Sequence, residues 1–289
     1  MELKQNPFSL YDFLGYFTPG AIFIYSFMAL LAHAGELNGD IIEALSFEKR
    51  QLYVPFVLAS YTTGHLLSFI SSVFIEKYTV WTIGYPSKYL LGFKPDKYFS
   101  INCFVRLIVG LLLTPISLTE FILNLTLKYR ATYAHALDDL LIATIKVKMD
   151  SLILDKSGLS KYPENTHSSR SDFFRFAYHF AVETAPNHFP KMQNYVAIYG
   201  FLRTMTMITV FFFWAALLHV SATSLSYHVL IIIFISLSIL SFTFYMSFVK
   251  FWRRFTLEAM MAIAVTYEVK EKVDPNNYLK NEAKKSDSP

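Results

Sequence analysis

Apolar stretches long enough to cross a lipid bilayer recur along this chain, and they limit its fold more than any other feature. A helix needs about 20 apolar residues to cross a hydrocarbon core of roughly 30 Å. Four stretches meet this length: Phe13–Ala34, Tyr53–Glu76, Thr204–Ser221 and Tyr227–Val249. In lipid the backbone must satisfy its own hydrogen bonds, so such stretches form helices. The sequence predicts an all-α, polytopic membrane protein with four transmembrane helices, or five, and a helical cytoplasmic domain.

A further apolar stretch, 107–127, leaves the number of spans open. It contains Pro115 and Glu120, so it either crosses with a kink and a buried acid or is embedded without crossing. With four spans, only Lys49 and Arg50 lie outside, and 24 of the 26 Lys and Arg residues share a side with both termini. If 107–127 also crosses, the N-terminus and residues 77–106 move outside, and the cytoplasmic side holds 20 of the 26. Basic residues favour the cytoplasmic side, so we favour four spans, an embedded 107–127 and cytoplasmic termini.

The apolar stretches also divide the chain into regions. Charged residues make up 17% of the sequence, against about 25% in soluble domains, and most lie between the second and third spans. Apolar residues at helical spacing predict cytoplasmic helices at 131–154 and 172–183. The predicted regions are a first transmembrane hairpin (13–77), an interfacial segment with the embedded helix and the cytoplasmic helical domain (78–203), a second hairpin (204–249), and an amphipathic helix with a disordered tail (250–289).

The second span, 53–76, carries polar residues along one side. Residues three or four apart share a helix face, which predicts a polar stripe of Tyr61, His65, Ser68, Ser72 and Glu76. Small residues repeat every four positions and predict a helix-packing ridge of Ser60, Gly64, Ser68 and Ser72. We favour packing, including assembly into a homo-oligomer, over a proton-handling face in which His65 titrates. Glu120 is the other embedded acid, and a contact with His65 or a lysine is left open.

Catalytic motifs are sparse. The segment Arg130-Ala-Thr-Tyr-Ala-His135 resembles the Arg-x4–6-His motif of HEPN ribonucleases over six residues. The resemblance implies that Arg130 and His135 pair at a dimer interface and cleave RNA, so a membrane-tethered ribonuclease is the alternative function. His179 and Glu183 are spaced to ligate a metal, but no further pair matches them. We therefore expect a protein that is not an enzyme, with no metal and no cofactor.

Basic and aromatic residues alternate just after the last span. Lys250, Arg253 and Arg254 stand among Phe and Trp residues and are predicted to contact anionic lipid headgroups. Nucleic-acid binding is not expected, because acidic residues are interspersed with the basic ones. The apolar faces of the cytoplasmic helices predict a cytoplasmic protein partner.

Two segments near the N-terminus, DFLGYFTPG and YTTGHLLSFISSVFIEK followed by GYPS, resemble a group of uncharacterised bacterial multi-pass membrane proteins. Some of that group lie in phage-defence gene neighbourhoods. The resemblance covers roughly the first 90 residues, implies an inner-membrane location and a role in antiviral defence, and transfers no site residues. The expected function is a multi-pass inner-membrane protein that oligomerises and acts as a signal-gated effector or pore.

Overall fold

Helices form every regular element in the part of the chain that the structure describes, which confirms the all-α prediction. The structure is a computed structural model that describes residues 12–33, 53–94, 102–127, 135–157, 173–219 and 226–269. Four helices are long and apolar enough to cross a membrane: Phe13–Ala32, Tyr53–Tyr89, Phe189–Leu218 and Tyr227–Thr266.

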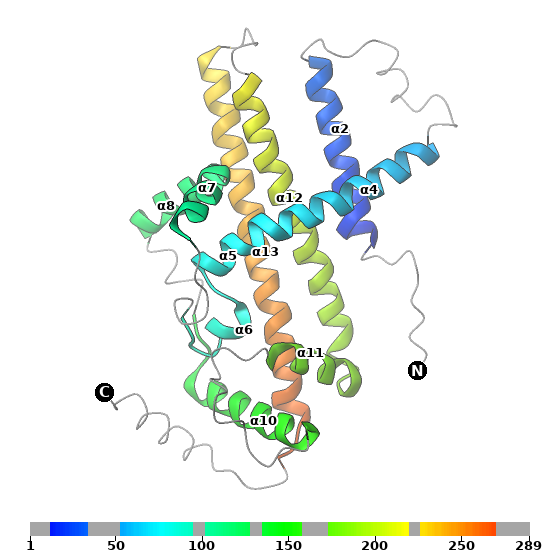
Figure 1. Cartoon of the computed structure of the whole chain (residues 1–289), viewed down its shortest axis with the longest axis vertical. Coiled ribbons are helices and arrows are strands. Elements are labelled where there is room, and N and C mark those ends of the chain that lie inside the picture. Colours follow the sequence, from blue (N-terminus) through cyan, green and yellow to red (C-terminus); the bar gives the residue numbers. More distant parts are fainter. Residues whose placement is uncertain are drawn as a thin grey trace. The chain divides into compact units, whose positions relative to one another are not determined.

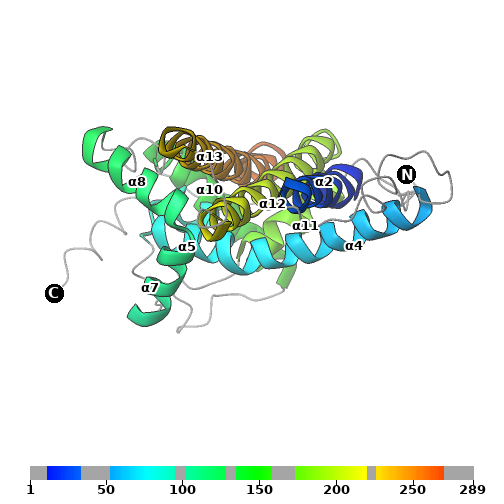
Figure 2. The ribbon, with the colours of Figure 1, turned by 90° about the horizontal axis from the view of Figure 1, so that it is seen from above.

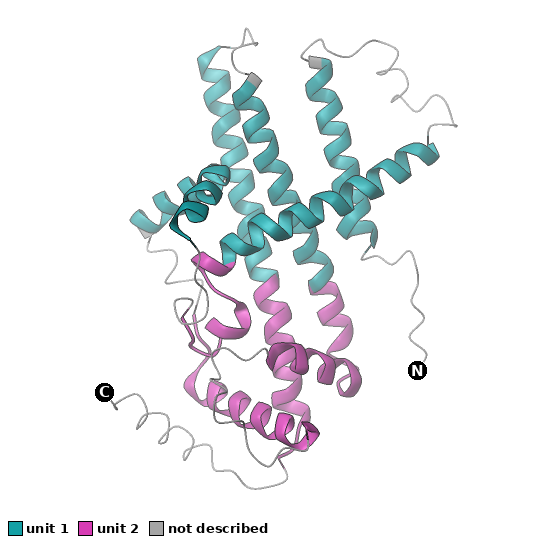
Figure 3. Cartoon of the chain, viewed as in Figure 1, with its two compact units in different colours: residues 1–79, 101–129, 196–251 teal, residues 80–100, 130–195, 252–289 magenta. Residues whose placement is uncertain are grey.

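The chain divides into two units (Figure 3), and each draws on separate parts of the sequence. Unit 1 comprises residues 1–79, 101–129 and 196–251, and unit 2 comprises residues 80–100, 130–195 and 252–289. The predicted embedded segment 107–127 therefore belongs with both predicted hairpins, whereas most of 78–203 belongs to unit 2. The two longest helices, α12 (Phe189–His219) and α13 (Tyr227–Thr266), contribute residues to both units.

Unit 1 begins with a π-helical turn, η1 (Phe13–Phe17), which continues into α2 (Thr18–His33). The next element, α4 (Tyr53–Ser71), runs on through a second π-helical turn, η3 (Ser72–Glu76), into α5 (Lys77–Thr82). Within unit 1, α2, α12 and α13 run along a common direction and α4 crosses them obliquely (Figure 1). The view from above shows α4 extended across the other three helices (Figure 2). The predicted hairpin 13–77 is thus a crossed pair of helices.

Glycines allow α2 and α4 to touch where they cross. A Cβ on Gly20 would lie 1.8 Å from the carbonyl oxygen of Ser60, and one on Gly64 would lie 1.9 Å from that of Tyr16. Beside this crossing, buried Leu67 of α4 packs with Met205 and Ile208 of α12. Phenylalanines of α2, α12 and α13 surround that group. The crossing and this apolar cluster join all four long helices of unit 1.

Residues 103–127 form two short helices with a sharp bend. The pair consists of α7 (Cys103–Leu112) and α8 (Thr114–Leu127), which meet at an angle of 98°. Pro115 lies in the first turn of α8, where a missing N–H costs no helical hydrogen bond. With a rise of 1.5 Å per residue the helices are only about 15 and 21 Å long. The bend excludes a single straight span, and the pair is either a broken span or an embedded, re-entrant segment, the two alternatives that the sequence left open.

Unit 2 contains α6 (Pro86–Tyr89), α10 (Asp139–Ser157), α11 (Phe173–Thr184) and parts of α5, α12 and α13. Its core includes Met149 and Leu152 of α10, Ala177 of α11 and Ile263 of α13. Helix α10 begins eight residues later than the predicted 131, and residues 128–134 lie outside the described ranges.

Polar contacts hold the helices of unit 2 together as well. The Lys148 ammonium donates to the carbonyl oxygen of Ala264 at 2.7 Å, at the C-terminal end of α13. The Nδ1 atom of His188 lies 2.8 Å from a carboxylate oxygen of Glu258, which also pairs with Lys191 at 3.5 Å.

Candidate functional site

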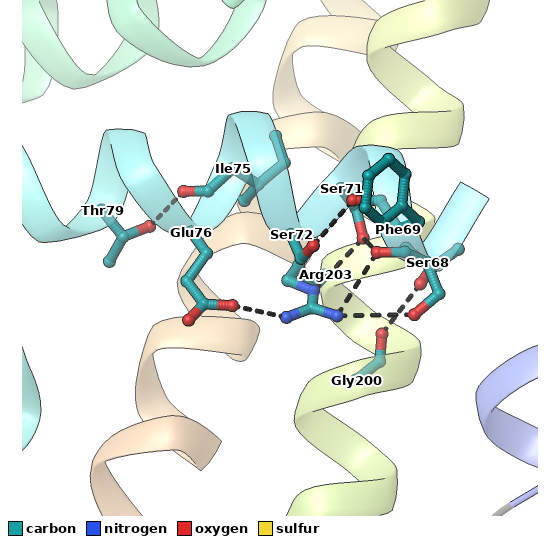
Figure 4. A network of polar contacts seen from close by, with 10 residues as sticks. Ser68, Phe69, Ser71, Ser72, Ile75, Glu76, Thr79, Gly200 and Arg203 are labelled. Atoms are coloured by element: carbon teal, nitrogen blue, oxygen red, sulfur yellow. Dashed lines mark hydrogen bonds and ion pairs between the residues drawn. The ribbon is translucent and has the colours of Figure 1, made fainter. Parts of the chain in front are cut away.

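Arg203 of α12 is the centre of a polar cluster in unit 1 (Figure 4). Its Nη1 donates to a carboxylate oxygen of Glu76 at 2.6 Å, and its Nε donates to Ser71 Oγ at 3.2 Å. Its Nη2 donates to both the carbonyl oxygen and Oγ of Ser68, at 3.4 Å each. All three guanidinium nitrogens therefore contact one face of α4 and η3.

Arg203 is the shielded member of the cluster. Its side chain is 13% exposed, whereas that of Glu76 is 35% exposed. A charge at this depth is tolerated only when it is paired and hydrogen-bonded. Removing one member of such a pair leaves the other uncompensated, so the pair acts as a unit. The contact fixes α4 to α12 at this point of the bundle.

The π-helical turn η3 brings Glu76 to the arginine. Ser71 and Glu76 are five residues apart, a separation that places side chains far apart around an α-helix. In a π-helical turn the pairing is i to i+5, so these two side chains come onto one face. The turn spans Ser72–Glu76, directly after Ser71. Mixed α and π geometry therefore builds the site.

The predicted polar stripe divides into separate contacts. Ser68 and Glu76 bind Arg203, whereas Ser72 Oγ donates to the carbonyl oxygen of Phe69 at 2.7 Å. Farther along α4, the exposed ring of His65 stacks on Tyr16 of η1, with centroids 3.8 Å apart. The Tyr61 ring meets His65 edge-on at 4.5 Å. The stripe thus makes two separate contacts, one with Arg203 of α12 and one with Tyr16 of η1.

The predicted packing ridge is used within the chain. Ser60 is fully buried and Gly64 lies against the backbone of Tyr16, so α2 and η1 cover this half of the ridge. The Ser60 hydroxyl is buried and has no hydrogen-bond partner among the residues that the structure describes. Ser68 faces Arg203 instead. Ser60 and Gly64 are therefore not available to a second copy.

Glu120, the acid of the bent pair, lies in a second buried contact of unit 1. The Tyr78 hydroxyl donates to a carboxylate oxygen of Glu120 at 2.6 Å, and both residues are buried. The Tyr78 ring also meets Tyr245 of α13 edge-on at 5.8 Å. At the end of α7, eight residues before Glu120, the carbonyl oxygen of Leu112 accepts a hydrogen bond from Trp214 Nε1 of α12 at 2.7 Å. These contacts fix the bend between α7 and α8.

Replacing Tyr78 with phenylalanine is expected to lower the free energy of unfolding by about 1–3 kcal/mol, because it removes a hydrogen-bond donor from a buried carboxyl group. Thermal unfolding of the purified protein in detergent measures the loss. Thr243→Ala is a suitable control, since its hydroxyl bonds only its own helix at Ile239 and the residue is exposed. An unchanged midpoint for Tyr78→Phe would show that Glu120 does not depend on this donor.

Other predicted site residues are placed as follows. His135 is exposed in a non-helical segment before α10, and Arg130 lies outside the described residues, so the ribonuclease alternative gains no support. On α13, Lys250 and Arg254 are exposed, and the buried Nε of Arg253 has no hydrogen-bond partner within the described ranges. Across the described ranges no three His, Cys, Asp or Glu side chains gather to hold a metal ion.

Sequence reasoning missed the role of Arg203, the residue immediately before the predicted span Thr204–Ser221. The available signal was a pair of opposite charges at span boundaries: Arg203 borders the third apolar stretch, and Glu76 ends the second.

No protein-family model, curated protein or solved structure matches this chain. The class of protein therefore rests on the helices themselves. By length and composition they are those of a multi-pass membrane protein.

Proposed function

We propose that this protein is a gated effector of the bacterial inner membrane, in which release of α4 from α12 opens a path for ions or small solutes. The observation that carries the proposal is the partly buried Arg203–Glu76 pair, formed across the crossing of two helices. An ion pair at a helix crossing is a reversible connection, because water or a competing charge can replace either partner.

The π-helical turn supports a two-state mechanism. Such turns are rare and concentrate at functional sites. Conversion of η3 into α-helix would rotate the residues after it by about 100° relative to those before it. Glu76 would then leave Arg203, and Tyr78, which follows η3, would leave Glu120. One local rearrangement would therefore break both buried contacts together.

The trigger in this proposal is a partner or signal that acts on the cytoplasmic helices. We also propose that copies assemble in the membrane. Their interface would lie away from Ser60 and Gly64, because the chain's own α2 and η1 cover these residues. A role in antiviral defence remains part of the proposal through the resemblance of the N-terminal segments.

Leak from liposomes tests the proposed gate. We expect wild-type protein to leak slowly, and Arg203→Gln or Glu76→Gln to release a trapped ion at least about tenfold faster, as loss of about 1.4 kcal/mol from the closed state would produce. Lys250→Gln is the matched control, because it removes a charge from an exposed position outside the cluster.

An exchange variant separates gating from misfolding. Arg203→Glu combined with Glu76→Arg restores opposite charges and is expected to lower the leak toward the wild-type rate. If the single variants are folded and monodisperse and yet leak no faster than wild type, the gate is not at this contact and the effector proposal fails.

A further inference from the structure

The bent pair α7–α8 presents a large apolar surface that unit 1 leaves uncovered. Several of its largest side chains are 66–75% exposed: Phe104, Leu107, Leu111, Phe121 and Leu125. Exposed apolar patches of this kind mark contacts with another apolar phase. Figures 1 and 2 together show both helices lying across the direction of α12 and α13.

The pattern of exposure identifies what covers this surface. The exposed apolar residues of α7 lie within about 160° of its circumference at 100° per residue: Phe104, Val105, Leu107, Ile108 and Leu111. Arg106 is exposed on the opposite side, so α7 is amphipathic, as expected of a helix that lies in the membrane interface. The end of α7 is hydrogen-bonded to Trp214, within the apolar helix Phe189–Leu218, so the pair lies beside a helix that could cross the membrane. Lipid is therefore the occupant that fits this surface.

The pair is also held in its bent form from within. Leu113 and Ile116 are fully buried next to the bend. Trp214 donates to the carbonyl oxygen of Leu112, and Tyr78 donates to Glu120. Opening the bend into one straight span would break these contacts, and neither helix alone is long enough to cross.

We infer that α7–α8 is a wedge inserted among the acyl chains of the leaflet expected to be cytoplasmic, and that it makes the protein prefer membranes in which this leaflet is convex. The wedge adds volume to one leaflet without adding the same volume to the other. Amphipathic segments inserted in this way bind in a manner that depends on membrane curvature.

The location of the wedge is testable with the chain's single cysteine, Cys103, which is exposed at the start of α7. An impermeant maleimide is applied to membrane vesicles of each orientation, using Cys103 itself and Thr126→Cys in a Cys103→Ser background. We expect both ends of the pair to react from the same side of the membrane. Reaction from opposite sides would show that the segment crosses, and would overturn the inference.

A second copy as the occupant is tested by oxidation in native membranes. If α7 packed against α7 of another copy, Cys103 would form a disulfide-linked dimer in high yield. We expect monomer after oxidation, and efficient dimer formation would overturn the assignment to lipid. A defined complex with another protein that protects Cys103 from a lipid-soluble maleimide would overturn it as well.

The curvature preference is measured by sorting between a flat giant vesicle and a narrow tube pulled from it, with the wedge in the outer leaflet. We expect about fourfold enrichment of wild-type protein in the tube, the change that one additional buried methylene group produces. Leu107→Ala with Phe121→Ala reduces the volume of the wedge and is expected to abolish the enrichment, while Thr243→Ala, at an exposed position of α13, keeps it. Equal sorting of wild type and the double variant would overturn the inference.

Discussion

Replacing Gly64 with alanine is expected to destabilise unit 1 by about 3 kcal/mol, the upper part of the range for overpacking a buried site. The added Cβ would lie 1.9 Å from the carbonyl oxygen of Tyr16 and 2.6 Å from its carbonyl carbon. Both are backbone atoms, so no side chain can rotate away and the two helices must separate. The separation would also disturb the stacking of His65 on Tyr16.

Unfolding of the purified protein in detergent measures this effect, and three other glycines calibrate it. Gly20→Ala is expected to be as damaging, because its Cβ would meet Ser60 at 1.8 Å. Gly110→Ala and Gly200→Ala meet nothing within 4 Å, and are expected to gain up to about 1 kcal/mol from helix propensity. Equal stability of all four variants would mean that α2 and α4 do not touch at these glycines.

Deleting Leu66 is expected to be far more harmful than deleting Val73, although both residues lie in the same continuous helix. Leu66 stands between Gly64 and Ser68 in regular α-helix, so its loss rotates all that follows by about 100° relative to the glycine crossing. The Arg203 and Glu120 contacts are then lost together, at a cost of about 3 kcal/mol. Val73 lies inside η3, and a π-helical turn contains one residue more than the α-helical turn that it replaces.

Removal of Val73 converts η3 into a normal α-helical turn and leaves Glu76 and Tyr78 on their original faces. The unfolding midpoint of the Val73-deletion variant is therefore expected to stay close to that of wild type. The Leu66-deletion variant is expected to unfold at markedly lower temperature or denaturant concentration. A Val73 deletion as unstable as the Leu66 deletion would show that η3 does not set the register of the two contacts. The Val73 variant should also resist gating, because it lacks the turn that rearranges.

The fold was largely predictable because length and apolarity are local properties of the sequence. Helix α12 begins at Phe189, well before the predicted span at Thr204, and α13 continues as one helix through the predicted membrane boundary at Val249. The oblique path of α4 was not predictable. It depends on the contact of Gly20 with Ser60, and a single sequence does not show which small residues meet.

The candidate site was predicted in part, for a physical reason that concerns helix geometry. Spacing of three and four residues placed Ser68, Ser72 and Glu76 on one stripe, but this spacing assumes α-helix throughout. The turn η3 shifts the register, so Ser71 joins the cluster and Ser72 does not. The partner of Glu76 is 127 residues away in the sequence, and no local pattern encodes that pairing.

At Gly20 and Gly64 the backbones of α2 and α4 touch directly, and α4 can pivot about this contact. No side chains interlock at these two glycines, so they resist a change of crossing angle less than larger residues would. Glu76 lies 12 residues beyond Gly64, on a lever arm of about 18 Å, so a tilt of about 10° moves it by about 3 Å. Such a displacement exceeds the tolerance of a hydrogen bond. A small swing at the glycines is therefore amplified into the loss of an ion pair.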